Sequence, residues 1–361
     1  MQNDQDSLQD ILARKPDYAL LGARADAPVP NPIPGAEASD ALATAEQPLD
    51  PPYTEQTFTL DDYQAEYQTW LDQSRLYALI DGLSLPDLPG QVSRRHPDVP
   101  VTLYHGPFGE HHEAETPRFV RLDADLLEWL QLAIEEDPGW GWHLVLRDDL
   151  AGLSPDATLE LLTDHFRPLV WVPQEAGGHW LFRLHDPSVL RNWLQCATPY
   201  QIERFMAPLR HLVIYTPDAI QVLTPRTIEP PLHITPLPPV PWPLQTLEAM
   251  HRLGREELLL RLQAHLHAQH PKTRDWPDEQ LRGFMIQNGN RAVEHGFQDE
   301  QSMSKFLSLC LVLGADFDGR EDGAWARDIL NKPTLQGQQS PIDQLVEGAL
   351  QYLDSTNEND T

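Results

Sequence analysis

The stretch of sequence that decides the fold runs from Phe166 to Leu209 and reads FRPLVWVPQEAGGHWLFRLHDPSVLRNWLQCATPYQIERFMAPL. An apolar run over 169–172, rich in β-branched and aromatic residues and stopped by Pro173, is typical of a buried strand. The pair Gly177-Gly178 can supply the positive φ angles that a tight turn requires. Apolar and polar residues then alternate over 180–185, which is the period of a second strand. The first half of the stretch therefore predicts a β-hairpin.

The second half predicts two helices, each opened by a dipeptide that ends in proline. Asp186 and Thr198 suit the N-cap position because their side-chain oxygens can accept hydrogen bonds from the amides of the first turn. Pro187 and Pro199 suit the first helical position. Apolar residues then follow at the spacing of one helical face. They are Val189, Leu190, Trp193 and Leu194 in the first helix, and Ile202, Phe205, Met206 and Leu209 in the second.

Further segments upstream match a known family in order and spacing. They are Tyr77–Gly82, Leu103–Gly106 and Pro117–Asp123 as strands, Leu126–Leu130 as a helix, and Gly139–Trp142 running into a strand over 143–146. Together with the hairpin and the two capped helices, they resemble the adaptor (effector chaperone) family of bacterial type VI secretion systems. The resemblance covers about residues 76–216 and rests on a conserved domain formerly of unknown function. The long acidic N-terminal extension has no counterpart in it.

The resemblance implies both a fold and a function. It implies an adaptor domain on a mixed sheet that binds a cognate toxic effector and loads it onto the valine-glycine-repeat spike protein. The partners would then be these two proteins, with no nucleic acid and no membrane. Separately, the chain shows no nucleophile–base pairing and no metal-ligand spacing, so we expect that the protein is not an enzyme and has no catalytic residue, cofactor or metal.

Composition is consistent with such a scaffold. The 361 residues carry a formal net charge of −29, which disfavours nucleic acid and anionic membrane surfaces as partners. Only four lysines occur and none lies in the adaptor-like segment, so a Lys-dependent phosphate loop or Schiff base is not expected there. The N-terminus lacks the basic and apolar regions of a secretory signal. Cys196 and Cys310 are expected to be buried thiols rather than a disulfide. These features predict a cytoplasmic protein.

Composition also divides the chain into four parts. Residues 1–55, acidic and rich in proline, are expected to be disordered. Residues 56–216 are predicted to form the α/β (α+β) mixed-sheet domain, with a leading amphipathic helix. Nine prolines within 217–243 predict a linker of polyproline II character. Residues 244–355 are predicted to form an all-α domain. Its five amphipathic segments lie near 247–262, 276–285, 306–313, 325–330 and 342–353.

Two groups of histidines have the composition of a metal site. The first consists of His105, His111, His112, Glu113 and Glu115, and the second of His265, His267 and His270. In the first group the run HHEAET lacks the second histidine of the zinc-helix pattern, because Thr116 stands in its place. A solvated polar loop is the favoured interpretation there. In the second group only one pair has the spacing of helical neighbours, so surface histidines are expected.

Four residues are candidates for partner binding: Arg183, Arg191, Trp140 and Trp142. The two tryptophans lie two apart on a predicted strand, so both rings would either fill the core, the favoured interpretation, or present an aromatic surface. The two arginines lie on polar faces of the hairpin and the first helix, where a guanidinium can bind carboxylates bidentately. The alternative for Arg183 is an ion pair with Asp186.

The sequence contains no Gly-x-Ser-x-Gly elbow and no glycine-rich phosphate loop. The predicted function is therefore that of a type VI secretion adaptor. Two alternatives remain. One is an immunity protein whose acidic surface suits a basic toxin, and the other is a cytoplasmic metal-dependent hydrolase that uses the His105–Glu115 loop.

Overall fold

The computed structural model describes residues 51–359 except 86, 89, 91–93, 95–101, 105, 114–115, 137, 174–178, 217–218, 227–240 and 332–338. The described residues fall into two compact units, 51–254 and 255–359. The extension predicted to be disordered over 1–55 lies outside the described residues, apart from its last five positions.

The first unit is built on a six-stranded sheet with the strand order β1-β8-β7-β4-β2-β3. The strands are β1 (Tyr53–Phe58), β2 (Leu76–Ile80), β3 (Arg118–Arg121), β4 (Gly141–Leu146), β7 (Leu209–Tyr215) and β8 (Ile220–Pro225). The predicted class, an α+β domain followed by a helical region, is confirmed. Every pairing in the sheet is antiparallel, however, whereas a mixed sheet was expected.

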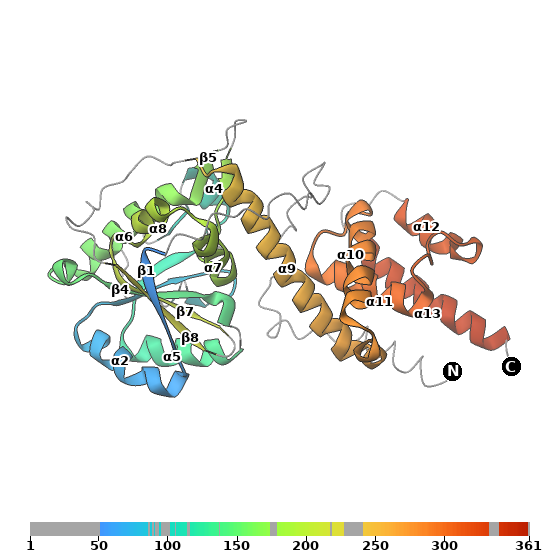
Figure 1. Ribbon diagram of the computed structural model, residues 1–361, viewed down its shortest axis with the longest axis horizontal. Coiled ribbons are helices and arrows are strands. Elements are labelled where there is room, and N and C mark those ends of the chain that lie inside the picture. The colour runs from blue at the N-terminus through green and yellow to red at the C-terminus, as the bar shows by residue number, and fades with distance from the viewer. Residues whose placement is uncertain are drawn as a thin grey trace. The chain divides into compact units, whose positions relative to one another are not determined.

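Helices cover both faces of this sheet (Figure 1). They are α2 (Leu60–Asp72) and α5 (Ala124–Glu136) on one face, and α6 (Pro155–Val170), α7 (Pro187–Cys196) and α8 (Pro199–Met206) on the other. β4 lies between the two layers and all six of its residues are buried. Neighbouring residues of a strand point to opposite faces. Accordingly, the Trp142 ring lies 5.7 Å from Phe166 of α6, and the His143 ring lies 5.5 Å from Tyr67 of α2.

The predicted helix caps are confirmed in atomic detail. Asp186 Oδ1 accepts hydrogen bonds from the amides of Ser188 (2.9 Å) and Val189 (3.3 Å) at the start of α7. Thr198 and Gln201 form a reciprocal capping box at the start of α8, each side chain accepting from the other residue's amide. Local sequence therefore determines where these two helices begin.

The hairpin prediction is right about the pairing but wrong about where the first strand starts. α6 continues through Val170, and only β5 (Trp171–Pro173) pairs with β6 (His179–Leu181), in a separate two-stranded sheet. The buried residues Leu159, Leu162, Phe166 and Val170 of α6 share one helical face. The apolar run thus extends a helix that is already amphipathic. The Gly177-Gly178 turn lies outside the described residues.

The predicted extension, the predicted linker and one predicted strand need correction. β8 lies inside the predicted proline-rich linker over 217–243, and β1 begins inside the predicted extension over 1–55. The two strands pair with each other, from Tyr53 opposite Pro225 to Phe58 opposite Ile220. Sheet pairing thus overrides the local proline content. In the described part of 103–106 (residues 103, 104 and 106) no strand forms: Thr102 makes an isolated bridge to Arg118, the Leu103 amide bonds to the Pro117 carbonyl, and Gly106 already begins α4 (Gly106–His111).

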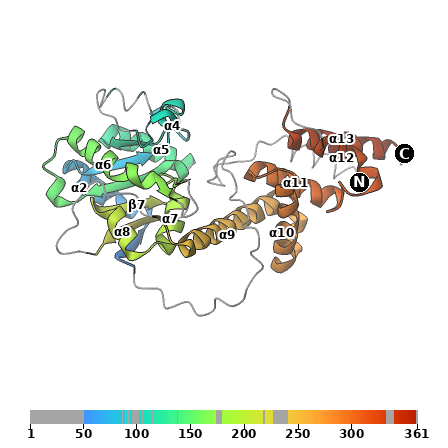
Figure 2. The same ribbon diagram turned by 90° about the horizontal axis from the view of Figure 1, so that it is seen from above.

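The second unit contains the predicted helices. α9 (Leu244–Gln269) begins in the first unit and is followed by α10 (Asp278–Glu294), α11 (Glu300–Leu313), α12 (Ala324–Leu330) and α13 (Pro341–Asn359). α11 packs against α10 and α13, and α12 packs against α13 (Figure 2). Asp318, after α11, accepts hydrogen bonds from Arg291 and His295 of the α10 end, which fixes the loop between them. No helix in the described ranges combines the length and the apolar composition that a membrane crossing requires.

A buried histidine lies in the core of the first unit. His143 Nδ1 is 2.8 Å from the Tyr67 hydroxyl and 3.0 Å from the Tyr215 hydroxyl. Complete burial lowers the pKa of His143 to about 3. The imidazole is therefore neutral at pH 7, and its Nδ1 can accept a hydrogen bond from one of the two tyrosine hydroxyls.

We expect this histidine to make the fold sensitive to acid. In the unfolded chain His143 takes up a proton near pH 6.5, and in the folded chain only near pH 3. The contribution of neutral His143 to the free energy of unfolding is therefore fully present above pH 6.5 and is lost as the pH is lowered towards 3. Between pH 7 and pH 5, His143 alone should remove about 2 kcal/mol from the free energy of unfolding. Urea unfolding of the wild type and of His143→Gln at both pH values measures this. An equal pH dependence in both proteins would contradict it.

Candidate functional site

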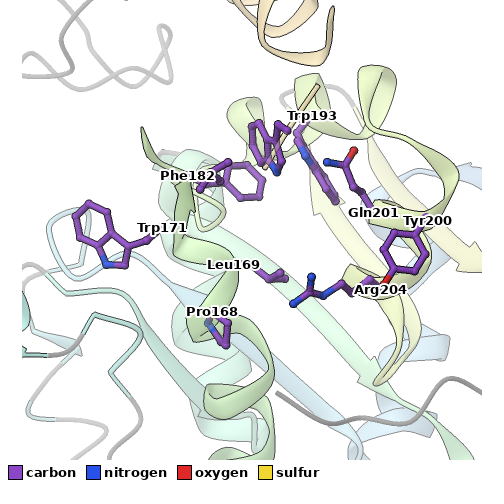
Figure 3. Close-up of a pocket in the computed structure, with 10 residues that line it drawn as sticks. Pro168, Leu169, Trp171, Phe182, Trp193, Tyr200, Gln201 and Arg204 are labelled. Atoms are coloured by element: carbon purple, nitrogen blue, oxygen red, sulfur yellow. The ribbon is translucent and has the colours of Figure 1, made fainter. Parts of the chain in front are cut away.

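A pocket opens on the face of the first unit that α6, α7 and α8 cover, between the end of α6, the small sheet, α7, α8 and Trp242, which precedes α9 (Figure 3). Its empty volume is about 420 Å³, part of it open to solvent. Aromatic side chains dominate the wall. The lining residues are Pro168, Leu169, Trp171, Val172, Phe182, Trp193, Tyr200, Gln201, Arg204 and Trp242.

The capped helices bring the aromatic wall together. Trp193 projects from α7 and is buried, with its ring 5.3 Å from Phe182 and 5.2 Å from Phe205 of α8. Trp242 completes the group, 4.8 Å from Phe182 and 6.0 Å from Trp193. Aromatic pairs at these separations stabilise beyond the area that they bury. The pocket wall is therefore a packed cluster rather than a set of mobile side chains.

Trp242 packs against this cluster because a hydrogen bond holds the start of α9 against the end of α7. The Thr246 hydroxyl donates a hydrogen bond to the Cys196 carbonyl at 3.2 Å. Further along α9, the His251 ring lies 5.7 Å from Trp180 of β6. The first turns of α9 thus hold Trp242, the residue before Pro243, against the pocket wall without lining it themselves.

Polar groups are few and lie on α8. Arg204 is buried, and in Figure 3 its guanidinium points towards Leu169 across the pocket, with Tyr200 beside it. Burial lowers the pKa of Arg204 below its ordinary value, although at neutral pH the group remains a cation. The Gln201 side chain is engaged in the capping box. A buried cation in an aromatic wall gives the pocket one charged recognition element.

The elements around the pocket also carry exposed apolar side chains. In the described part of the first unit, seven large apolar residues are exposed, and four of them lie on β6, α8 and the start of α9. These four form what we name the rim: Trp180 (40% exposed), Leu181 (37%), Tyr200 (52%) and Leu244 (57%). Exposed apolar side chains that gather mark interaction sites. The rim residues lie on elements that adjoin the pocket, and Tyr200 also lines it, while Trp180 and Leu181 point to opposite faces of β6. The pocket and its rim therefore suit contact with another protein.

The arginines predicted to bind a partner lie outside the pocket wall. Arg183 donates a hydrogen bond to Asp186 Oδ2 at 2.9 Å, while the other oxygen of that carboxylate caps α7. The alternative weighed for Arg183, an ion pair with Asp186, is thus present. Arg191 is half-buried on α7. A partner contact by either residue stays a prediction.

Trp140 and Trp142, for which the core was the favoured interpretation and an aromatic surface the alternative, are both fully buried. Trp140 lies in the 3₁₀ turn η3 (Pro138–Trp140) that precedes β4, so strand alternation does not apply to the pair. The Trp140 ring lies near His143 and Tyr215, whereas Trp142 lies among Phe119, Phe166 and Phe205. Both rings fill the core, and neither offers a surface to a partner.

The histidine groups show no metal-binding geometry where they are described. His111 ends α4 (Gly106–His111), with its ring 4.8 Å from that of His112, but His105 and Glu115 lie outside the described residues. Among described residues, no three His, Cys, Asp or Glu side chains gather closely enough to hold a metal ion. His265 and His270 are half-buried rather than on the open surface, and burial lowers the pKa of His270 to about 4.

One comparison with known proteins bears on this unit. Residues 76–204 match a family model described as a domain of unknown function (DUF4123). The matched segment runs from the first residue of β2 to Arg204 in α8 and so includes most of the pocket wall, but not Trp242. The chain matches no curated protein and no solved structure.

Sequence reasoning missed the residues that define the pocket. Tyr200 and Arg204 lie on α8, whose apolar face was predicted. Neither residue belongs to that face, so the sequence pattern did not indicate that they line a pocket. Trp242 stands in a Pro-Trp-Pro run that was interpreted as linker. An isolated tryptophan among prolines was the one available signal, because an aromatic residue of that size is seldom left without a packing partner.

Trp193 should be the main structural support of the pocket. Trp193→Ala should lower the free energy of unfolding by about 3–5 kcal/mol, because it removes a buried indole from between three other aromatic rings. Chemical denaturation measures the loss. Trp180→Ala, which truncates an exposed indole, is the matched control and should change stability by less than about 1 kcal/mol. Equal losses in the two variants would contradict this assignment.

Arg183 should support the α7 cap. Arg183→Glu places a second carboxylate beside Asp186 and should lower stability by about 1 kcal/mol, with a smaller loss for Arg183→Gln. Thermal unfolding and partner capture are measured on the same variants. Unchanged stability together with lost capture would instead assign Arg183 to the partner interface.

Proposed function

We propose that the protein is a type VI secretion adaptor that binds a cognate toxic effector and loads it onto the valine-glycine-repeat spike protein. The observation that carries this proposal is the aromatic pocket with its apolar rim. It lies largely within the segment that resembles the adaptor family and that matches the domain of unknown function.

The chemistry of the pocket favours protein binding. Tryptophan, tyrosine and arginine are the side chains that contribute most to interface affinity, and here they line one wall together. The rim would cover an apolar segment of the effector that is otherwise exposed to water before secretion. A second, weaker contact with the spike would hold the two proteins on one scaffold, where combined avidity exceeds either affinity.

This function places the protein in the bacterial cytoplasm, where effector and spike are made and meet before export. It requires no catalytic residue, cofactor or metal. The absence of an enzyme activity and the cytoplasmic location are therefore parts of the proposal, together with the two protein partners.

The effector contact can be tested on the rim. The double variant Trp180→Ser/Tyr200→Ser should fold normally, because both side chains are exposed, yet should retain at least about tenfold less effector in pull-downs from the native bacterium. The matched control is Leu132→Ser/Leu153→Ser, which removes two exposed apolar side chains outside the rim. Mass spectrometry quantifies the retained proteins, and thermal unfolding checks the fold. Equal retention by both double variants would contradict the rim assignment.

Co-expression with the captured toxin separates an adaptor from an immunity protein. An adaptor raises the solubility and secretion of the toxin and leaves its toxicity in a recipient cell intact. An immunity protein protects the cell that makes it. Protection without any effect on secretion would contradict the proposed function.

A further inference from the structure

The two edge strands of the six-stranded sheet differ in how they are covered. β3 is four residues long, and the segment before it lies along its outer side, where Thr102 bridges Arg118 and the Leu103 amide bonds to the Pro117 carbonyl. β1, the blue strand in Figure 1, is six residues long and pairs only with β8 among the described strands. We name its outer side the β1 edge. Within the described ranges this edge of the sheet is open.

The register determines which backbone groups of β1 face away from β8. The Arg226 amide donates to the Pro52 carbonyl at 2.8 Å, so these two residues form a hydrogen-bonded pair. Hydrogen-bonded and non-hydrogen-bonded pairs alternate along an antiparallel ladder. The amides and carbonyls of Tyr53, Glu55 and Thr57 therefore point away from β8. Among the residues that the structure describes, none forms a hydrogen bond with these outward groups.

The β1 edge lacks most of the features that prevent a sheet edge from pairing with another chain. Natural edges are commonly very short, interrupted by a bulge, or supplied with lysine or proline. β1 reads YTEQTF, without lysine or proline, and its register with β8 runs through all six pairs without a bulge. Its four middle residues, Thr54 to Thr57, are exposed. The edge can therefore accept a further strand.

The charge of the β1 edge indicates what kind of strand it accepts. Glu55 is the only charged residue of β1, is exposed, and forms no ion pair with a described residue. The basic residue that follows β8, Arg226, lies opposite Pro52, before β1 begins. A basic side chain opposite Glu55 would add a favourable cross-strand pair. The net charge of −29 also attracts basic segments and repels acidic ones.

A second copy of the chain fits this edge less well. The symmetric antiparallel pairing that uses all three outward residues is centred on Glu55, so it places Glu55 of one copy opposite Glu55 of the other. Like charges directly opposite destabilise a sheet, and each copy carries −29 in total. Residues 1–50 suit the edge no better in composition, because they hold nine acidic residues against three basic ones and six prolines.

We propose that the β1 edge is a docking site for an extended, basic segment of a partner protein, which pairs with β1 as an added strand. Backbone hydrogen bonds supply the affinity in this mode of recognition, and the side chains opposite the edge supply the specificity. The β1 edge lies outside the matched segment 76–204 and shares no residue with the pocket wall or the rim. The strand addition is independent of the proposed function, but naming effector or spike as the partner rests on it.

The backbone pairing is tested with the full-length protein and a fluorescent nonapeptide of alternating Val and Lys. Fluorescence anisotropy should show binding that weakens about tenfold in Thr57→Pro, because proline removes an outward amide and leaves the hydrogen bonds to β8 in place. Thr57→Ala keeps that amide and is the matched control, which should bind within about twofold of the wild type. The same peptide with every backbone nitrogen methylated keeps its charge but cannot form a ladder, so it should not bind.

The charge preference is tested with Glu55→Lys, which leaves the backbone of β1 unchanged and also guards against a folding defect in the proline variant. It should weaken binding of the Val/Lys peptide about fivefold and strengthen binding of a Val/Glu peptide. Glu66→Lys makes the same charge change at an exposed position of α2 and is the matched control. Equal weakening by both variants would overturn the proposal, since binding would then follow net charge alone.

Hydrogen exchange identifies the occupant of the edge. In the free protein the amides of Glu55 and Thr57 should exchange rapidly, and the Val/Lys peptide should slow both. Slow exchange in the free monomer would show that the chain covers its own edge. A dimer seen in sedimentation and abolished by Thr57→Pro would show that a second copy occupies it. Either result would overturn the proposal, as would equal binding of the peptide by Thr57→Pro and the wild type.

The outcome is separable from that of the proposed function. If peptide binding does not depend on the outward amide of Thr57 but the rim variant still loses the effector, this inference fails and the adaptor function stands. If the wild type captures neither effector nor spike while the peptide still depends on that amide, the adaptor function fails and the docking site at the β1 edge stands.

Discussion

A buried hydrogen bond joins the central strand of the sheet to the segment that leads into α7. Trp142 Nε1 on the central strand donates to the Leu184 carbonyl at 2.7 Å, in the segment between β6 and α7. The indole is fully buried, so loss of this partner would leave a donor without compensation in an apolar layer. Gly141 just before it is required by a close approach, because a Cβ there would clash with the Leu79 carbonyl of β2. The central strand and the segment between β6 and α7 are thereby held in a fixed position relative to each other.

After Leu184, two helix caps determine where α7 and α8 begin. Leu184 is followed by Asp186, which begins α7, and α7 carries Trp193 towards Phe182. Thr198 then begins α8, which carries Arg204 to the facing side of the pocket. Caps of this kind contribute about 1 kcal/mol each. Their larger effect is directional, because a helix that starts one residue later would rotate its aromatic face away from the pocket.

The sequence predicts well what local chemistry controls and poorly what distant pairing controls. The caps at Asp186 and Thr198, the burial of Trp193 and the C-terminal helices follow from nearest neighbours, and all are present. The pairing of β1 with β8 joins residues about 170 positions apart and contradicts their local composition, so no local pattern could reveal it. The pocket also depends on a contact between residues distant in sequence, because Trp242, which follows the last strand along the chain, packs against Phe182. Trp140 was misplaced because a 3₁₀ turn breaks the alternation that a strand would impose.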